Sequence, residues 1–252
     1  MKTQYVLFFI LVLFYFGEGN LYALPEGGSV VAGEASIHLQ DSQTLAVGQA
    51  TDRTIINWDQ FNIASNETVL FTQPGPDAVA LNRVTGGDPS SILGRLSANG
   101  HLFLVNPEGI FFGPNARLDV GGLVATTLNI KDDDFLSGKT NFQETNRVVG
   151  TIVNQGEIAV SDGGFVFLVA PSVSNAGIIR APGGEVVLMT QGGSDILSSV
   201  INQSGIIEAN SLVNQGGVIR LIASDPVENT GQLGWQTHLG EVTGAMGNVM
   251  VV

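Results

Sequence analysis

Histidine and acidic side chains are the residues of this chain with the most obvious capacity for chemistry. His38, His101 and His238 lie far apart in the sequence, and the chain has no cysteine. Structural and catalytic zinc sites place His and Cys ligands at short, regular spacings. Serine hydrolases place their nucleophile in a Gly-x-Ser-x-Gly turn. Neither pattern is present, so we expect no metal site, no cofactor and no nucleophilic catalysis.

An acidic cluster, Asp132-Asp133-Asp134, is the sharpest concentration of carboxylates. Carboxylates on a loop can bind Ca²⁺ through oxygen. The cluster lacks the spacing of an EF-hand loop and of the glycine-aspartate nonapeptide repeat, and charge runs are usually solvated. We interpret it as part of a polar excursion from the main body, near residues 131–147.

Short β-type runs make up residues 28–128, and each is bounded by Gly, Asn, Asp or Pro. This pattern predicts many short strands and repeated turns. With 44% hydrophobic residues, 13% charged residues and 33 Gly, the chain can bury a core but is not an ordinary helical domain. Its net charge of −13 disfavours nucleic acid as a partner, because phosphate binding relies on Lys and Arg.

Residues 1–23 have the features of a secretory signal peptide. Lys2 precedes an unbroken apolar run from Tyr5 to Phe16, and Ala23 is a small residue suited to cleavage. The run is shorter than the roughly 20 residues that span a bilayer. We therefore expect export through the Sec pathway, with residues 24–252 as the mature domain. The lack of cysteine also excludes disulfides and a lipoprotein anchor.

An internal repeat follows Val148. The segment 154–158 recurs at 175–179 and 214–218, with looser copies at 202–206 and 229–233, and a second marker at 163–169 returns at 183–189. The first marker recurs after 21 residues and the second after 20, a period typical of a solenoid. Asn and Gly suit its tight corners. The predicted structural corner residues are Asn154, Gly156, Asn175, Gly177, Asn214 and Gly216.

The predicted fold is all-β, a right-handed parallel β-helix of roughly ten turns with about 20 residues each. Residues 24–50 are expected to form an N-terminal β cap, because an open solenoid end exposes a sheet edge and the core. The chain stops at an apolar segment, 248–252. We expect the coil to continue in a longer exoprotein. Five aromatic residues are interpreted as core: Phe103, Phe111, Phe112, Phe165 and Phe167.

A strand-length run from His101 to Val105 is followed by a turn, Asn106-Pro107-Glu108-Gly109, and by Ile110. Proline at the second turn position and glycine at the fourth are typical of a type I turn. The segment resembles the Asn-Pro-Asn-Gly-Ile motif in the secretion domain of two-partner-secretion exoproteins, the filamentous haemagglutinin and high-molecular-weight adhesin family. Glu108 stands where that family usually has Asn.

The resemblance covers nearly all of residues 24–130, in the family's order. Its other blocks are 24–33, 56–63, 69–71 and 80–84. It implies that an outer-membrane transporter binds the domain in the periplasm through POTRA domains, and that the domain folds outside the cell, where the product is secreted or surface-bound. Candidate recognition or motif residues are Asn62, Arg83, Asn106, Pro107, Gly109 and Ile110.

Two alternatives remain open at this point. The first is a β-helical polysaccharide-active enzyme, although its best candidate acids, Asp162, Glu185 and Asp195, form no repeating pair. The second is an adhesive module that contacts host cells or matrix, which would need an exposed stripe repeating at the solenoid period. We expect such contacts to lie in regions beyond this chain. Transporter recognition itself could use β-augmentation by the strand 54–58.

Overall fold

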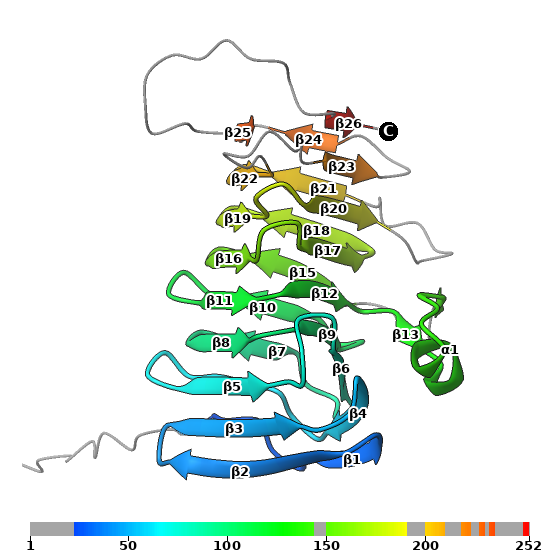
Figure 1. The fold of residues 1–252 in the computed structure, drawn as a ribbon. Helices are drawn as coiled ribbons and strands as arrows, with labels where there is room; N and C mark the ends of the chain where they lie inside the picture. Colours follow the sequence, from blue (N-terminus) through cyan, green and yellow to red (C-terminus); the bar gives the residue numbers. More distant parts are fainter. Residues whose placement is uncertain are drawn as a thin grey trace, which may run out of the picture.

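The structure is a computed structural model that describes residues 23–143, 150–190, 200–209, 218–222, 227–229, 232–234 and 249–251. Successive turns of chain stack in sequence order, from β1 and β2 at one end to β25 and β26 at the other (Figure 1). Three sheets run along the stack. The fold is an all-β parallel solenoid, which confirms the predicted class.

Sheet I and sheet II have nine strands each, and sheet III has six. Sheet I contains β1 (Ser29–Ala32), β4 (Arg53–Trp58), β6 (Val79–Val84), β9 (His101–Val105), β12 (Gly122–Thr126), β17 (Phe165–Ala170), β20 (Glu185–Thr190), β23 (Val218–Ile222) and β26 (Val249–Val251). Sheet II contains β2 (Ala35–Asp41), β3 (Thr44–Gln49), β5 (Thr68–Thr72), β8 (Arg95–Ala98), β11 (Arg117–Val120), β16 (Glu157–Val160), β19 (Ile178–Arg180), β22 (Ile206–Glu208) and β25 (Gln232–Gly234). Sheet III contains β7 (Ser90–Ile92), β10 (Ile110–Phe112), β15 (Thr151–Asn154), β18 (Ser172–Asn175), β21 (Val200–Gln203) and β24 (Val227–Asn229).

The number of turns is smaller than predicted. A complete turn crosses all three sheets once, so the six strands of sheet III mark six complete turns, with partial turns at both ends. The expectation of ten was wrong because the turns differ in length. Phe165 and Glu185 are register partners 20 residues apart, but Leu123 and Val166 lie 43 apart and Glu185 and Val218 lie 33 apart.

The interior of the coil is filled by inward side chains that stack on their counterparts. In sheet I, each of these residues pairs with the next along the stack and is at most 3% exposed: Leu102, Leu123, Val166, Val186 and Ile219. Neighbouring strands lie about 4.8 Å apart, so equivalent side chains are in contact. This stacking explains why the same β-branched and leucine residues recur at each turn.

The N-terminal end is closed by two antiparallel strands. β1 pairs with β4 and β2 pairs with β3, whereas the strands that follow in sheets I, II and III pair in parallel. Strand β3 belongs to the stack itself, so the cap consists of β1 and β2. This arrangement agrees with the predicted β cap.

A short excursion leaves the coil after β12. It contains β13 (Asn129–Ile130), α1 (Asp132–Leu136) and β14 (Phe142–Gln143), with β13 and β14 paired antiparallel. Three aspartates occupy the first turn of α1, where carboxylates interact favourably with the helix dipole. No helix among the described residues is long and apolar enough to cross a membrane.

Candidate functional site

The motif turn is a closed corner between sheets I and III. The amide of Gly109 donates to the carbonyl of Asn106 at 3.1 Å, as expected for a four-residue turn. Gly109 has φ +120°, a conformation that side-chain-bearing residues rarely adopt. Ile110 follows as the first residue of β10 and is 2% exposed. Pro107 and Glu108 are partly buried between them.

Asn106 uses its whole side chain to hold this corner. Its Nδ2 donates to the carbonyl of Asp88 and to Oγ of Ser90, both at 3.0 Å, and its Oδ1 accepts from the amide of Glu108 at 3.0 Å. The residue is 0% exposed. The asparagine therefore ties its own turn to the preceding turn of the solenoid, and none of its polar atoms faces solvent in the folded domain.

Asn62 holds a second loop in a similar way. Its Oδ1 accepts from the amide of Ser91 at 2.8 Å, and its Nδ2 lies 3.4 Å from Oε1 of Gln60. The next residue, Ile63, is 0% exposed and forms an isolated bridge with Ile92. Asn62 and Asn106 thus bind opposite ends of the segment 88–92 without contacting one another directly.

Arg83 points away from the coil and holds the excursion. Its Nη2 lies 2.7 Å from both Oδ1 of Asp132 and the carbonyl of Ile130. Its Nε donates to Oδ1 of Asn129 at 3.1 Å. The side chain is 15% exposed, whereas that of Asp132 is 47% exposed. Four of the five donors expected of a guanidinium are not needed elsewhere, so the excursion is the main partner of this arginine.

Arg53 makes a second contact with the excursion. Its Nη1 donates to the carbonyl of Phe135 at 2.9 Å, and its guanidinium lies 5.3 Å from the centroid of the Phe135 ring. This geometry combines a charge-assisted hydrogen bond with a cation–π contact. Arg53 and Arg83 lie on neighbouring strands, β4 and β6.

Beneath these arginines lies a second hydrophobic core, outside the coil. The ring of Phe135 packs edge-on against Phe103, with centroids 5.7 Å apart. Phe142 lies 6.3 Å from Phe103 on another side. The buried members are Ile55, Val79, Leu81, Phe103, Val105, Val124, Ile130 and Phe135. Sheet I is therefore apolar on both faces where the excursion covers it.

A ladder of amide side chains runs inside the coil at the corner that follows sheet III. Asn154 Nδ2 donates to Asn175 Oδ1 at 2.7 Å, and Asn175 Nδ2 donates to Gln203 Oε1 at 2.8 Å. All three residues are 0% exposed. Gly156 and Gly177 follow them, and a Cβ on Gly177 would collide with the backbone of Gly156.

The later repeat copies were aligned incorrectly. Gln203 rather than Asn202 is the register partner of Asn175, so that copy is shifted by one residue. Val218 was matched to Ile158 of sheet II, but it begins β23 and pairs with Glu185 of sheet I. It therefore belongs to the second marker, because paired glycines precede strands at both corners. Asn214 and Gly216 lie outside the described residues.

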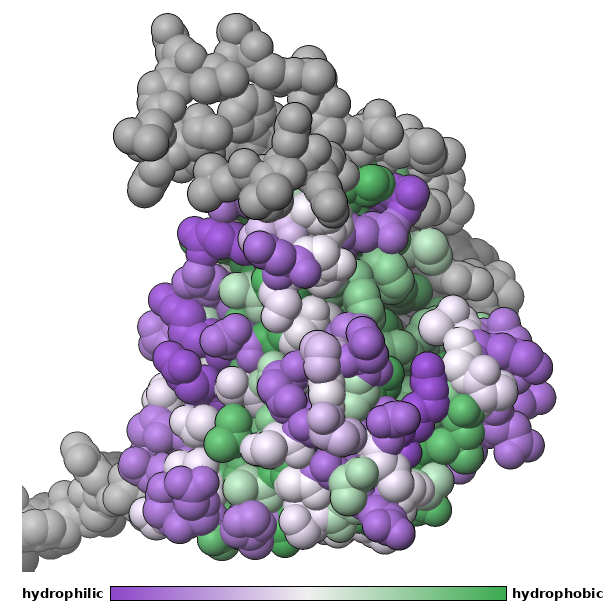
Figure 2. Space-filling model, in the orientation of Figure 1, coloured by the Kyte–Doolittle hydropathy of each residue, from purple (hydrophilic) through white to green (hydrophobic). Residues whose placement is uncertain are grey.

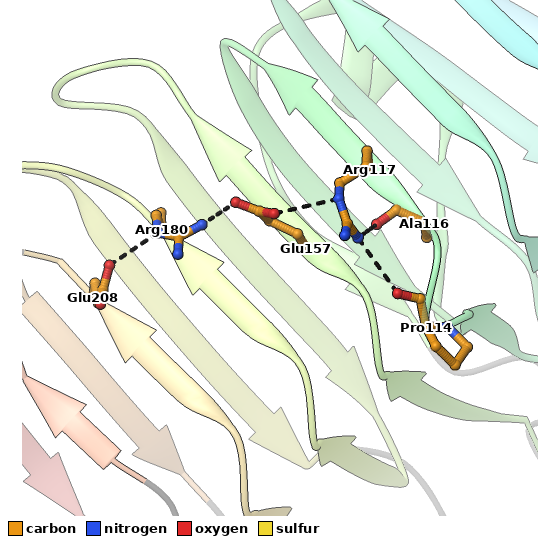
Figure 3. Close-up of polar contacts among 6 residues, drawn as sticks. All are labelled: Pro114, Ala116, Arg117, Glu157, Arg180 and Glu208. Atoms are coloured by element: carbon orange, nitrogen blue, oxygen red, sulfur yellow. Dashed lines mark hydrogen bonds and ion pairs between the residues drawn. The ribbon is translucent and has the colours of Figure 1, made fainter.

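An ion-pair chain crosses the outer face of sheet II over four turns (Figure 3). Glu157 contacts Arg117 and Arg180, and Arg180 also contacts Glu208 at 3.0 Å. Arg117 Nη1 donates in addition to the carbonyl of Ala116 at 2.8 Å. The four side chains are 23–51% exposed, so each pair contributes only about 0–1 kcal/mol.

The candidate chemical residues do not form a site in the described part of the chain. His38 is exposed, His101 stacks on Phe165 at 4.8 Å, and His238 lies outside the described residues. No group of three or more His, Asp or Glu residues there could hold a metal ion. Asp132 pairs with Arg83, Glu185 pairs with Arg220, and Asp162 is exposed in a turn, while Asp195 is not described.

The aromatic residues are not all in the coil core. Phe112 is, but Phe103 lies in the second core, and Phe111, Phe165 and Phe167 point outward and are partly buried. The prediction was wrong because it ignored the alternation of side chains along a strand. Figure 2 shows the result as hydrophobic surface that continues beside the excursion.

The second core and its arginine contacts were missed from the sequence. Two signals pointed to them. Phe135 and Phe142 stand in an otherwise polar and charged segment. Strands β9 and β17 read His-Leu-Phe-Leu-Val and Phe-Val-Phe-Leu-Val-Ala, which are apolar at consecutive positions, as expected for strands covered on both faces.

Comparison with known proteins agrees with this architecture. The model of the TPS secretion domain family matches residues 22–244. Two curated heme/hemopexin-binding proteins of Haemophilus influenzae are each 37% identical, over 179 and 135 residues, or 67% and 52% of this chain. The chain spans only 19% and 14% of their lengths.

A solved structure supports the same assignment. The crystal structure of the HMW1 secretion domain from Haemophilus influenzae superposes with a TM-score of 0.71 at 28% identity, covering 83% of this chain and 66% of that one. The chain therefore belongs to the TPS secretion domain family, the non-catalytic secretion module of exported two-partner-secretion exoproteins.

Proposed function

We propose that residues 24–252 are recognised in the periplasm by the POTRA domains of a partner outer-membrane transporter, after a signal peptide in residues 1–23 has directed export. The domain then folds into the solenoid outside the cell. One observation carries this proposal. Strands in the three sheets of the coil pair only with the turn before and the turn after. Such a fold can form turn by turn as the chain emerges.

Folding in this way also supplies a driving force for export. Each added turn buries apolar side chains such as Val166 and Val186, and pairs a new row of backbone groups. Burial of apolar surface is the main favourable term in folding. Chain that has folded outside is not drawn back, so no nucleotide hydrolysis is needed.

Recognition by β-augmentation of the strand 54–58 would require an unfolded or partly folded domain. In the folded domain β4 is paired with β1 on one side and with β6 on the other. The same holds for the motif turn, since Asn106 is fully buried and bonded internally. These contacts support a corner role for Asn106, Pro107, Gly109 and Ile110.

The test of the proposed function is secretion of tagged residues 1–252 in cells with and without the partner transporter. We expect the protein in the medium only when the transporter is present. Equal export in both strains would contradict the proposal. So would retention of a folded product in the periplasm of both.

The motif can be tested within the same assay. Asn106→Ala and Asn175→Ala both remove a fully buried corner asparagine, but only the first lies in the motif turn. If Asn106 has only a corner role, the two variants lose secretion in proportion to their loss of stability in urea. A greater secretion loss for Asn106→Ala at equal stability would assign the turn to recognition.

The heme/hemopexin-binding activity named for the relatives is a second candidate for the exoprotein. It is favoured by the 37% identity, but the matched region is 19% of that relative's length. We propose that such binding belongs to other parts of an exoprotein. Purified residues 24–252 should then fail to retain heme or hemopexin in a pull-down, and retention would assign the activity to this domain.

A further inference from the structure

The excursion is inserted late in the coil but packs on early turns. It leaves after β12, yet its residues contact Arg53 of β4, Arg83 of β6 and Phe103 of β9. The contact between Arg83 and Asp132 joins residues 49 positions apart. The excursion therefore folds back over turns that precede it in the chain.

The covered face has a defined composition. Ile55, Leu81 and Phe103 are register partners on successive strands and point away from the coil. They are 0%, 0% and 6% exposed in the complete domain and belong to the second core. Arg53 and Arg83 lie on the same outward face of β4 and β6. We call these five residues the acceptor face.

The excursion shows what this face binds. Arg83 takes a carboxylate, from Asp132, and a main-chain carbonyl, from Ile130. Arg53 takes a second carbonyl and the face of an aromatic ring, both from Phe135. Phe103 takes the edge of that ring. A fitting ligand is thus a short segment with an acidic and an aromatic side chain about one helical turn apart.

The order of the chain leaves this face uncovered for a time. The acceptor face is complete at residue 103, whereas the excursion begins at Asn129. A chain that forms its turns from the N-terminus therefore presents an apolar surface with two arginines before its own cover arrives. An uncovered patch of this kind is typical of a protein-binding surface.

We propose that the acceptor face docks a segment of the partner transporter's periplasmic region that carries an acidic and an aromatic side chain, and that the excursion later displaces it. The inference rests on the proposed function. Docking holds the early turns at the transporter. Displacement releases them once residues up to 143 have been exported and the second core can close.

The test uses two phenylalanines that touch each other. Phe103 belongs to the acceptor face and Phe135 to the excursion, and both are nearly fully buried in the same core. Binding of the purified transporter periplasmic region to purified residues 24–252 is measured for the wild type, Phe103→Ala and Phe135→Ala. We expect several-fold tighter binding for Phe135→Ala and several-fold weaker binding for Phe103→Ala.

Opposite signs distinguish competition from simple loss of stability. A transporter that reads only the unfolded chain would bind both variants more tightly, and equal affinities would mean that the face is not used. Either result overturns the inference while leaving transporter-dependent secretion intact. Wild-type secretion that does not depend on the transporter would instead reject the proposed function, and this inference with it.

A second pair guards against misfolding of Phe103→Ala. Arg83→Met and Asp132→Asn break the same ion pair from its two sides, near the surface. We expect weaker transporter binding for Arg83→Met and tighter binding for Asp132→Asn. Changes of the same sign in both variants would contradict the proposed competition.

Discussion

The side-chain amide of Asn154 donates a hydrogen bond of 2.7 Å to Asn175, the residue that stacks on it one turn later. Asn175 repeats the contact with Gln203. Each amide thus satisfies the next inside an apolar core that water does not reach. A buried amide without a partner is costly, so the ladder also fixes the register of the turns.

Removing the middle of this ladder should be strongly destabilising. Asn175→Ala leaves the donor of Asn154 and the acceptor of Gln203 without partners, which should cost about 2–4 kcal/mol of unfolding free energy. Urea unfolding followed by circular dichroism measures the loss. Asn141→Ala, at an exposed position, is the matched control and should cost under about 0.5 kcal/mol. A loss below about 1 kcal/mol for Asn175→Ala would refute the ladder's importance.

The corner glycines should tolerate no side chain. A Cβ on Gly177 would collide with backbone atoms of Gly156 and Gln155, which cannot move without separating two turns. Gly177→Ala should therefore cost more than about 2 kcal/mol. Gly75 has no atom within 4 Å of an added Cβ, so Gly75→Ala should be neutral or slightly stabilising. Similar melting temperatures for the two variants would contradict this account.

The ion-pair chain on sheet II should matter little to stability. Arg180→Met breaks the contacts with Glu157 and Glu208, but these side chains are partly exposed and screened. We expect a loss of about 0.5–1 kcal/mol at low salt that becomes smaller in 0.5 M NaCl, because about 4 Å of Debye length remains there. A loss that does not change with salt would show that packing of the arginine stem, rather than charge, is responsible.

Stability should fall slightly on mild acidification because of His101. Burial lowers the pKa of this histidine, partly offset by Asp77 and reinforced by Arg53. The unfolded chain then binds more protons than the folded one just below the unfolded pKa of 6.5. The contribution is fully present above that pKa and is lost as pH falls through it. Melting temperatures between pH 7.5 and 5.5 should drop less for His101→Phe than for the wild type.

The sequence contained enough to predict the solenoid, because stacking in register requires like residues at like positions. Asn154 and Asn175 follow one another after 21 residues, and so the corner was legible. The cap was predictable from alternation in the segment 36–40, which forms part of β2. Both signals are local or periodic.

Long-range contacts leave no such signal. The pairing of Arg83 with Asp132 spans 49 residues and involves a segment that interrupts the repeat. Val218 was placed in the wrong sheet because loops of unequal length shift the period, and Gly-Gly occurs at more than one corner. The outward Phe165 and Phe167 could have been separated from the core by alternation, had strand boundaries been known.

The antiparallel cap gives the molecule a mechanical polarity. At the N-terminal end β1 and β2 run against the stack, whereas strands β23 to β26 at the other end continue it in parallel. Tension applied from the C-terminal end would therefore peel one turn at a time, since each turn is held by its neighbour. The excursion, tied through Arg83 to the early turns, would act as a brake on that unpeeling. A chain drawn through a pore from this side would behave as a ratchet, with each rewound turn resisting backward slip.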